Sequence, residues 1–464
     1  MTKHTFKFIF PILLAFGSCR SIKPDRPPPS NGPVPPEAIS SIHIPVEVPL
    51  SYIEEKLNVR PYSKMFQDQE MPMGSGLTAS LDVDRNGAIR LTGTGNEFLQ
   101  AKIPMQVKGN LKIEKRVFGQ VLSTDFPFDE AIAPQFSFQP HIGENWDFQV
   151  KNLEIDSWGK SLRYNLLGFE IDLDPLIRRQ VQRVLDNQLS AANLEQLDFK
   201  ALAESLWQTL AAYHAIDGGG MRVNISSLPK KIGFHQEIGQ DQILRLYVAV
   251  EGELAASLGK PLAEPQPTPL PKLSPNPYKD NLLDLTVPVS IPFLELDRLI
   301  KRDFEGTPLQ LDTKTLLVPS NLKTQAYGDM TLLSMDFEAT RKDKKVVRGK
   351  MYFAGTPSYD PRTKSINFSK PRFHVKSDDF FSNLAIRLKK GKIQRQMRKV
   401  ANIPIGGFLE NASQSLSEAA HWDLDFADLW IREIKPDITG IYQTQEDIQV
   451  YINATGKVEV KIKR

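Results

Sequence analysis

Closely spaced acidic side chains are the first candidates for chemistry in this sequence. Asp82, Asp84 and Asn86 precede Gly87 with the spacing of the first half of a calcium-binding loop, in which oxygen ligands at alternate positions wrap a hard cation. The twelfth position of that loop is Gly93 rather than the bidentate glutamate that such a site uses. We therefore expect this segment to form a turn between strands and not a metal site.

Pairs of acidic residues two positions apart are candidates for general acids and bases. The same spacing is typical of the wet face of a strand or of the residues before a helix, and it occurs at Glu170, Asp172, Asp174, Asp423 and Asp425. The histidines are scattered and never take the spacing of a zinc site. The sequence has no nucleophile elbow, phosphate loop or dinucleotide fingerprint. We expect a protein that is not an enzyme, with no catalytic residues, no metal and no cofactor.

Cys19 is the only cysteine and is a candidate for lipid attachment. A basic segment, the apolar run Phe8 to Phe16 and the small residues Gly17-Ser18 precede it, which is the order of a secretory signal over residues 1–18. This arrangement resembles the lipobox of bacterial lipoproteins, although Phe16 stands where leucine is usual. The motif predicts an acylated Cys19 at the start of the mature chain. An unmodified thiol in a cleaved leader is the alternative.

An acylated Cys19 places the protein in the cell envelope of a Gram-negative bacterium, as an outer-membrane lipoprotein. No acidic run follows the cysteine, which by resemblance to lipoproteins with surface-export tags favours the periplasmic face. A basic stretch with helical apolar spacing is a second candidate for contact with the membrane surface, through Arg387, Lys389, Lys390, Lys392 and Arg395. The alternative for this stretch is the solvated outer face of a core helix.

Length and composition describe a globular protein. The chain has 464 residues, of which 41% are hydrophobic and 24% charged, and this is enough for two or three domains. The net charge of +3 is too small to indicate a nucleic-acid partner.

An internal repeat organises the chain. Residues 42–57 and 285–300 align without a gap when Pro49 is placed on Pro292. Apolar residues alternate up to this proline and then take helical spacing, so each copy predicts a strand that turns directly into a helix. A second proline inside each predicted strand indicates an edge position in the sheet.

Two proline-rich segments mark the predicted boundaries. Residues 19–37 cannot bury a core, and they predict an extended tether that holds the folded part away from the membrane. Residues 259–280 predict a linker. We therefore expect a first unit over residues 38–258 and a second over residues 281–464, each folding by itself.

Several elements are predicted inside the first unit. The segment 77–91 reads as a hairpin that turns at Asn86-Gly87, and 197–216 reads as a helix. Ser51 and Glu54 have the spacing of a capping box for the helix of the opening repeat. Strands with one apolar face, combined with amphipathic helices, predict a mostly antiparallel α+β fold.

The lipobox-like Cys19, the paired openings IPVEVPLSYIEEKL and VPVSIPFLELDRLI, the amphipathic helices and the chain length resemble a bacterial lipoprotein family called domain of unknown function 4403. That family is similar to the tubular lipid-binding (TULIP) superfamily, which includes the bactericidal/permeability-increasing (BPI) proteins. The resemblance implies two tandem TULIP-like, BPI-like units, each a highly curved sheet wrapped around a long amphipathic helix.

The same resemblance implies an apolar groove in each unit, and the candidate lining residues are Ile44, Val46, Val48, Ile103, Met105, Val107, Val287, Val289, Ile291, Val450 and Ile452. These residues would be apolar whether they line a groove or pack a dry core. Two functions therefore stay open. In the favoured one, the membrane-anchored protein binds lipid or another apolar ligand for storage, sensing or transfer. In the other, it is a non-enzymatic structural or interaction module with closed cores.

Overall fold

The computed structural model describes residues 22–30, 32–59, 62–74, 77–95, 97–117, 120–166, 169–188, 199–218, 221–312, 315–341, 346–377, 403–404, 406, 410, 414, 421–423 and 427–463. Most of these residues form β-strands, and two of the sheets curl into half-barrels. The described residues divide into two compact units. Unit 1 takes those within 1–35, 290–406 and 440–450, and unit 2 takes those within 36–289, 407–439 and 451–464.

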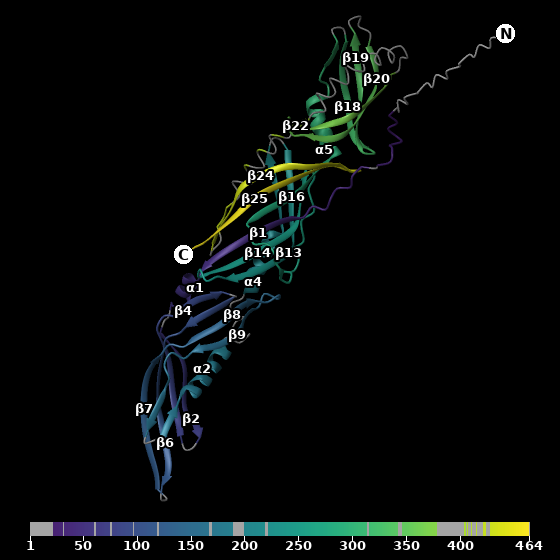
Figure 1. Cartoon of the computed structure of the whole chain (residues 1–464). Helices are drawn as coiled ribbons and strands as arrows, with labels where there is room; N and C mark the ends of the chain where they lie inside the picture. The colour runs from purple at the N-terminus through teal and green to yellow at the C-terminus, as the bar shows by residue number, and fades with distance from the viewer. Residues whose placement is uncertain are drawn as a thin grey trace, which may run out of the picture. The chain divides into compact units, whose positions relative to one another are not determined.

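Most of one large sheet, called here the central sheet, belongs to unit 2, and its main path runs β12, β13, β14, β1, β16, β25, β24, β23 (Figure 1). The strand bounds are β12 Ala212–Gly218, β13 Met221–Ile238, β14 Ile243–Leu258, β1 Ser40–Pro49, β16 Leu282–Pro292, β25 Asp447–Ile462, β24 Ala427–Gln443 and β23 His421–Asp423. The path consists of two four-strand series that meet at β1 and β16, the opening strands of the two sequence repeats. The compact units therefore divide the chain differently from the predicted repeat boundaries.

Strand β1 pairs with β14 along its whole length, from Ser40 opposite Gly252 to Pro49 opposite Ile243. Its pairing with β16 covers Ser41 and Ile42. At Pro45, β1 therefore pairs with β14 alone. This is the edge position that was predicted from the proline.

The structure confirms the strand-to-helix junction in both repeats. Helix α1 (Leu50–Leu57) directly follows β1, and helix α5 (Phe293–Phe304) directly follows β16. The first N–H of each helix donates to a carbonyl in a hairpin loop: Leu50 to Gln242 at 3.0 Å and Phe293 to Glu446 at 3.3 Å. The two junctions are therefore held in the same way.

The predicted capping box is wrong, because no side chain caps the start of α1. Glu54 instead accepts a hydrogen bond from the backbone N–H of Leu91 at 2.7 Å. Asp297, its equivalent in the second repeat, accepts from the backbone N–H of Thr324 at 2.5 Å. One carboxylate thus fixes each opening helix to a strand beside it, through a charge-assisted hydrogen bond.

The remaining strands of unit 2 form smaller sheets. Their orders are β2 (Tyr62–Gly74), β3 (Leu77–Asn86), β6 (Met105–Val117), β7 (Gln120–Ile132); β4 (Arg90–Gly95), β5 (Phe98–Lys102), β8 (Gln135–Ile142), β9 (Phe148–Ser157); and β10 (Arg163–Leu166), β11 (Phe169–Asp172). The predicted hairpin over 77–91 is wrong, because β3 pairs with β2 and β6 while β4 pairs with β5. Asn86 and Gly87 lead from one sheet into another.

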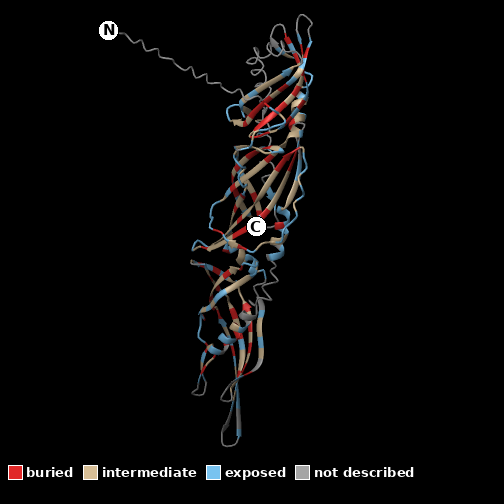
Figure 2. Cartoon of the chain, turned by 90° about the vertical axis from the view of Figure 1, so that its right-hand side faces the viewer, coloured by how far each residue is buried: buried red, intermediate tan, exposed pale blue. Residues whose placement is uncertain are grey.

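Helix α2 (Asp174–Gln188) is amphipathic. It buries Ile177 and Val181 against sheet residues that include Leu111 and Phe136, and it exposes Arg178. We call this cluster the α2 core. Buried residues follow α2 and the strands around it in Figure 2.

A second helix of unit 2, α4, covers Phe199–Leu210 and is shorter than the predicted helix over 197–216. The residues that follow, Ala212–Gly218, form strand β12. This strand forms a hairpin with β13, in which Gly218 lies opposite Met221. Gly218 therefore ends a strand and does not end a helix.

Unit 1 contains a six-stranded sheet in the order β17 (Leu309–Asp312), β18 (Thr315–Tyr327), β19 (Met330–Arg341), β20 (Val346–Asp360), β21 (Ser365–Ser377), β22 (Ile403–Pro404). Its core is formed by buried residues such as Leu317, Phe337 and Phe353. Ile300 and Phe304 of α5 pack against this core, so the second opening helix covers the sheet with its apolar face.

Candidate functional site

The predicted groove residues fall into two different environments. Ile103, Met105 and Val107 belong to the α2 core, where Met105 and Val107 have 0% exposure. Met105 and Val107 are thus completely covered, whereas Ile103 is half-buried and packs against the same cluster. This part of the predicted groove is a closed core.

The other candidates lie on the central sheet. Ile44, Val46 and Val48 are half-buried on β1; Val287 and Ile291 on β16 and Ile452 on β25 are also half-buried, while Val289 and Val450 are buried. The structure thus brings eight of the eleven predicted residues to one sheet and separates the remaining three from it.

One side of the β1–β14 pair carries a continuous set of half-buried apolar side chains, which we call the apolar face. Direct partners in the antiparallel register share a face, and the pairs are Ile42 with Val250, Ile44 with Val248, Val46 with Leu246 and Val48 with Leu244. All eight residues are half-buried. The apolar face is therefore accessible where the α2 core is not.

Packed clusters border the apolar face. Toward β13, Val248 and Val250 pack with Ile232 and Trp207. Toward β16 and β25, Ile42 and Ile44 pack with Leu283 and Val458. Val46, Val48 and Leu246 follow these clustered residues in the β1–β14 register and are half-buried, and we call these three positions the centre of the face.

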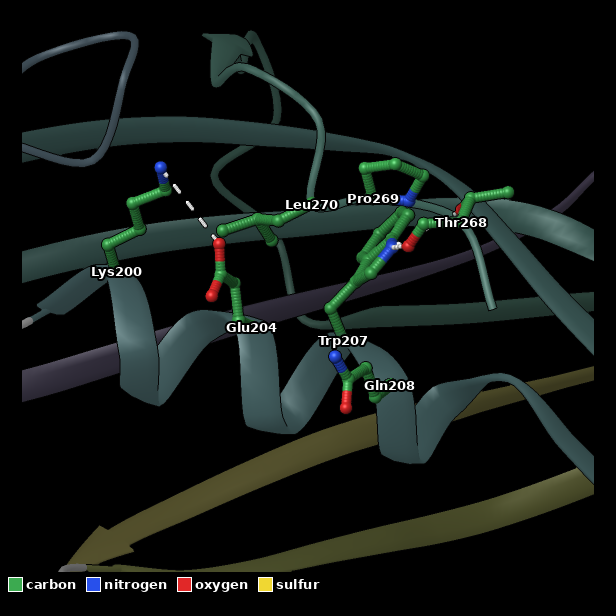
Figure 3. A pocket seen from close by; sticks show the side chains of 7 residues that line it. All are labelled: Lys200, Glu204, Trp207, Gln208, Thr268, Pro269 and Leu270. Carbon is green, nitrogen blue, oxygen red and sulfur yellow. Dashed lines mark hydrogen bonds and ion pairs between the residues drawn. The ribbon is translucent and has the colours of Figure 1, made fainter. Parts of the chain in front are cut away.

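A pocket of about 320 Å³ lies beside the β13 border, between α4 and the proline-rich segment (Figure 3). It is lined by Lys200, Glu204, Trp207, Gln208, Thr268, Pro269 and Leu270. The indole N–H of Trp207 donates to the carbonyl of Thr268 at 2.9 Å, and Lys200 lies 4.0 Å from Glu204. Apolar groups therefore meet a cation and an anion at the same place, an arrangement suited to the polar end of an amphiphile.

The second half of the predicted linker is a strap, defined here as Thr268–Asp280, which is bound to the central sheet. Trp146 donates its indole N–H to the carbonyl of Pro271 at 2.9 Å, and Leu273 is buried. Strand β15 (Ser274–Pro275) pairs in parallel with β13. A Cβ on Gly233 would lie 3.2 Å from that of Asn276, so the glycine makes room for the strap.

The end of the strap covers part of the opposite, polar face of the sheet. Tyr278 stacks on the buried His43 with ring centroids 4.3 Å apart, and Asp280 forms an ion pair with His43. A hydrogen bond from Lys279 lowers the pKa of Glu237, and a hydrogen bond from Arg245 lowers the pKa of Asp241. These opposite charges neutralise one another pairwise, and the described residues contain no cluster of potential metal ligands.

The pocket and the strap were not predicted from the sequence. The signal available was the presence of Leu270 and Leu273 within a segment otherwise rich in proline and polar residues, together with Trp146 and Trp207 elsewhere in the first repeat. Apolar residues in a predicted linker indicate that it packs on something, but they do not identify the surface.

The predicted membrane contacts lie outside the described residues, namely Cys19 and the basic stretch Arg387, Lys389, Lys390, Lys392 and Arg395. Among the helices that are described, none combines the length and the apolar character needed to cross a bilayer.

Comparisons with known proteins give the family of the chain. No curated protein sequence matches it. It is similar to the crystal structure of lipopolysaccharide binding protein, at 12% identity, with 92% of this chain and 99% of that chain covered and a TM-score of 0.24. It is also similar to the crystal structure of P47 of Clostridium botulinum E1, at 11% identity, with 89% and 98% covered and a TM-score of 0.22. Likenesses at these TM-scores carry no argument about function. The model of the family "Domain of unknown function (DUF4403)" matches residues 38–462, and the chain therefore belongs to this family.

Proposed function

We propose that this protein is a non-enzymatic, membrane-anchored envelope lipoprotein that binds lipid or another apolar ligand on the apolar face of the central sheet. The observation that carries the proposal is the set of eight half-buried apolar residues on the paired strands β1 and β14. Covering apolar surface contributes about 25 cal/mol per Å², so an acyl chain laid along these strands is stabilised by every side chain that it shields.

The ligand class is an amphiphile with an apolar chain and a polar end. The chain lies over Val46, Val48 and Leu246, whose side chains are half-buried. The polar end reaches the pocket beside α4, where Lys200 and Glu204 offer one charge of each sign. Storage, sensing and transfer of such a ligand all use this arrangement.

We propose that the membrane anchor is an acylated Cys19. It holds the protein in the outer membrane of a Gram-negative bacterium, facing the periplasm. A single acyl chain binds a membrane only marginally, whereas several chains anchor it stably. Metabolic labelling with a fatty-acid probe is expected to mark the wild-type protein and not Cys19→Ala. Labelling that survives the substitution would contradict the anchor.

The repeats are proposed to be two tandem TULIP-like units over residues 38–258 and 281–464, and the mirrored strand series of the central sheet supports this arrangement. Because β1 pairs with β16, cleavage in the exposed residues before the strap is expected to leave two fragments that elute together in size-exclusion chromatography. Fragments that separate while each stays folded would show that the repeats are independent domains.

Native mass spectrometry with lipid extraction tests the ligand directly, on the soluble form lacking residues 1–20. We expect a stoichiometric lipid or fatty acid in the wild type and its loss in Val46→Trp, which fills the centre of the apolar face. Glu47→Trp is the matched control, because Glu47 is the exposed neighbour on the other side of β1. Loss of ligand in both variants, or in neither, would contradict binding on this face.

A second function, a structural or interaction module with closed cores, is favoured by the complete burial of Met105 and Val107 in the α2 core. A protein that carries no ligand and takes up no fluorescent lipid would support this alternative.

A further inference from the structure

The N-terminal segment is bound to unit 1 and is not the free tether that its proline content predicts. Ile22 is 3% exposed in a cluster with Tyr327, Leu332 and Ala354 of the unit 1 sheet. The backbone N–H of Lys23 donates to the Tyr327 hydroxyl at 3.1 Å. The first described residue after the predicted anchor is therefore part of a folded core.

Two further contacts fix the segment at the turn between β18 and β19. Asp329 accepts hydrogen bonds from the Ser30 hydroxyl at 2.8 Å and from the Gly32 backbone N–H at 2.7 Å. Gly328 has a φ of +63°, and a Cβ there would lie 2.9 Å from the ring of Pro28. The turn thus has the backbone and the space to receive the prolines, and we call this arrangement the N-terminal clamp (Ile22–Gly32 on Tyr327–Asp329).

The clamp restricts where an anchor at Cys19 can lie. From residue 19 to residue 22 the chain spans at most about 11 Å, since an extended residue covers about 3.6 Å. Ala354 packs on Ile22, and Arg372 lies directly opposite Ala354 in the β20–β21 register. Lys23 and Arg26 lie within the clamp and are exposed, and basic side chains next to an anchor favour an anionic lipid surface.

We propose that the N-terminal clamp turns the surface of unit 1 around Arg372 toward the membrane, so that the lipoprotein is held in one orientation instead of swinging on a spacer. This inference rests on the proposed anchor at Cys19. The partner is an anionic bilayer surface, and the orienting contacts are those of Ile22 and Asp329.

Site-specific fluorescence quenching in vesicles tests the orientation. The acylated full-length protein is reconstituted in vesicles of phosphatidylglycerol and phosphatidylethanolamine that contain a lipid with a headgroup nitroxide. With Cys19 blocked by its acyl chains, a fluorophore is placed on Arg372→Cys or on Arg348→Cys, both at exposed positions of the unit 1 sheet. Arg348 precedes Ala354 by six positions, about 20 Å along the strand. We expect stronger quenching at residue 372 than at residue 348, because residue 372 lies opposite Ala354 beside the clamp and residue 348 lies further along the sheet.

Release of the clamp is the decisive comparison. Ile22→Gln combined with Asp329→Ala is expected to remove the difference between the two positions, while Asp336→Ala, an acidic residue of the same sheet outside the clamp, is expected to keep it. Equal quenching in the wild type, or a difference that survives the double variant, would overturn the proposal.

Failure of the anchor at Cys19 and failure of the clamp are distinguished by two separate measurements. Fatty-acid labelling reports whether Cys19 is acylated, whereas hydrogen exchange reports the clamp. The Gly32 amide is expected to exchange roughly ten-fold faster in Asp329→Ala, as loss of a hydrogen bond to a charged acceptor predicts. Absence of labelling would remove the anchor alone, and unchanged exchange would remove the clamp.

Discussion

The α2 core and the apolar face of the central sheet are built from the same kind of strand, yet they have different consequences. Met105 and Val107 on β6 are completely buried under α2, whereas Val46 and Val48 on β1 are half-buried. The strand pattern is apolar at every second residue in both regions. What differs is that the first region shares a buried cluster with Ile177 and Val181 of α2, whereas the side chains at the centre of the apolar face keep part of their surface exposed.

Alternation of apolar and polar residues along a strand indicates which side of the strand avoids water. It does not indicate what covers that side. A covered face stabilises the fold, while a partly covered face can stabilise a complex. Substitutions that act on one region and not on the other therefore separate the two roles, and the expected effects are given below from the largest to the smallest.

Truncation of a large side chain is expected to lower the free energy of unfolding strongly in the α2 core and weakly on the apolar face. Leu111→Ala, at 0% exposure in the α2 core, is expected to lower the free energy of unfolding by about 2–5 kcal/mol, because it removes buried area and leaves a cavity. Val46→Ala on the half-buried face is expected to cost less than about 1 kcal/mol. Urea unfolding of both variants measures this, and equal losses would show that the two regions are packed alike.

Insertion of a large side chain is expected to lower stability in the α2 core and to lower lipid uptake on the apolar face. Val107→Trp has no space in the α2 core and is expected to cost about 1–3 kcal/mol. Val46→Trp is expected to leave the unfolding midpoint close to the wild-type value while abolishing uptake of a fluorescent lipid. A Val46→Trp protein as destabilised as Val107→Trp would mean that the face is closed.

Two hydrogen bonds to the strap come from tryptophans outside the central sheet, Trp207 on α4 and Trp146 between β8 and β9, and single substitutions can remove them. Trp207→Phe keeps most of the ring and loses the hydrogen bond to Thr268, which is worth about 0.5–1.5 kcal/mol. We expect a small loss of stability and faster proteolysis between Pro261 and Thr268. The matched variant Trp146→Phe removes the bond to Pro271 and should accelerate cleavage at the same place; if neither variant does so, these bonds do not hold the strap.

The last effect is absent near neutral pH and is a pH dependence confined to the α2 core. Burial, with a contribution from Glu130, raises the pKa of Tyr164 from 10.0 to about 12. The folded protein thus keeps the neutral phenol where the unfolded chain has already ionised, so this contribution is complete below pH 10 and is lost as the pH rises from about 10 to about 12. Stability measured across this range should fall less steeply in Tyr164→Phe, and identical slopes would exclude Tyr164 as the cause.

Some features of the fold follow from the sequence and others do not. The junctions at Pro49 and Pro292 were predictable because a change from alternating to helical spacing is local, and proline fixes the point of change. The role of Glu54 was missed because its hydrogen-bond partner, the Leu91 N–H, lies 37 positions further along the chain. Long-range partners of this kind leave no local pattern.

The proline-rich segments show the same limit. Their composition predicts an extended backbone, which is what Thr268–Asp280 has, but an extended segment can lie on a sheet as well as in solvent. The burial of Ile22 and Leu273 decides between these states in the structure, and it depends on the shape of a surface formed by other parts of the chain. Of the candidate groove, the sequence predicts the apolar positions but cannot separate Val46 from Val107.

Photo-crosslinking with a diazirine fatty acid is the most direct test of the central claim, that ligand binds on the β1–β14 face. We predict crosslinked peptides from Ser40–Pro49 and Ile243–Leu258 in the wild type and in Glu47→Trp, and their loss in Val46→Trp. Crosslinks concentrated in β6 or α2 would place the ligand in the α2 core instead, and crosslinking no greater than that of an unrelated protein would contradict lipid binding by this chain.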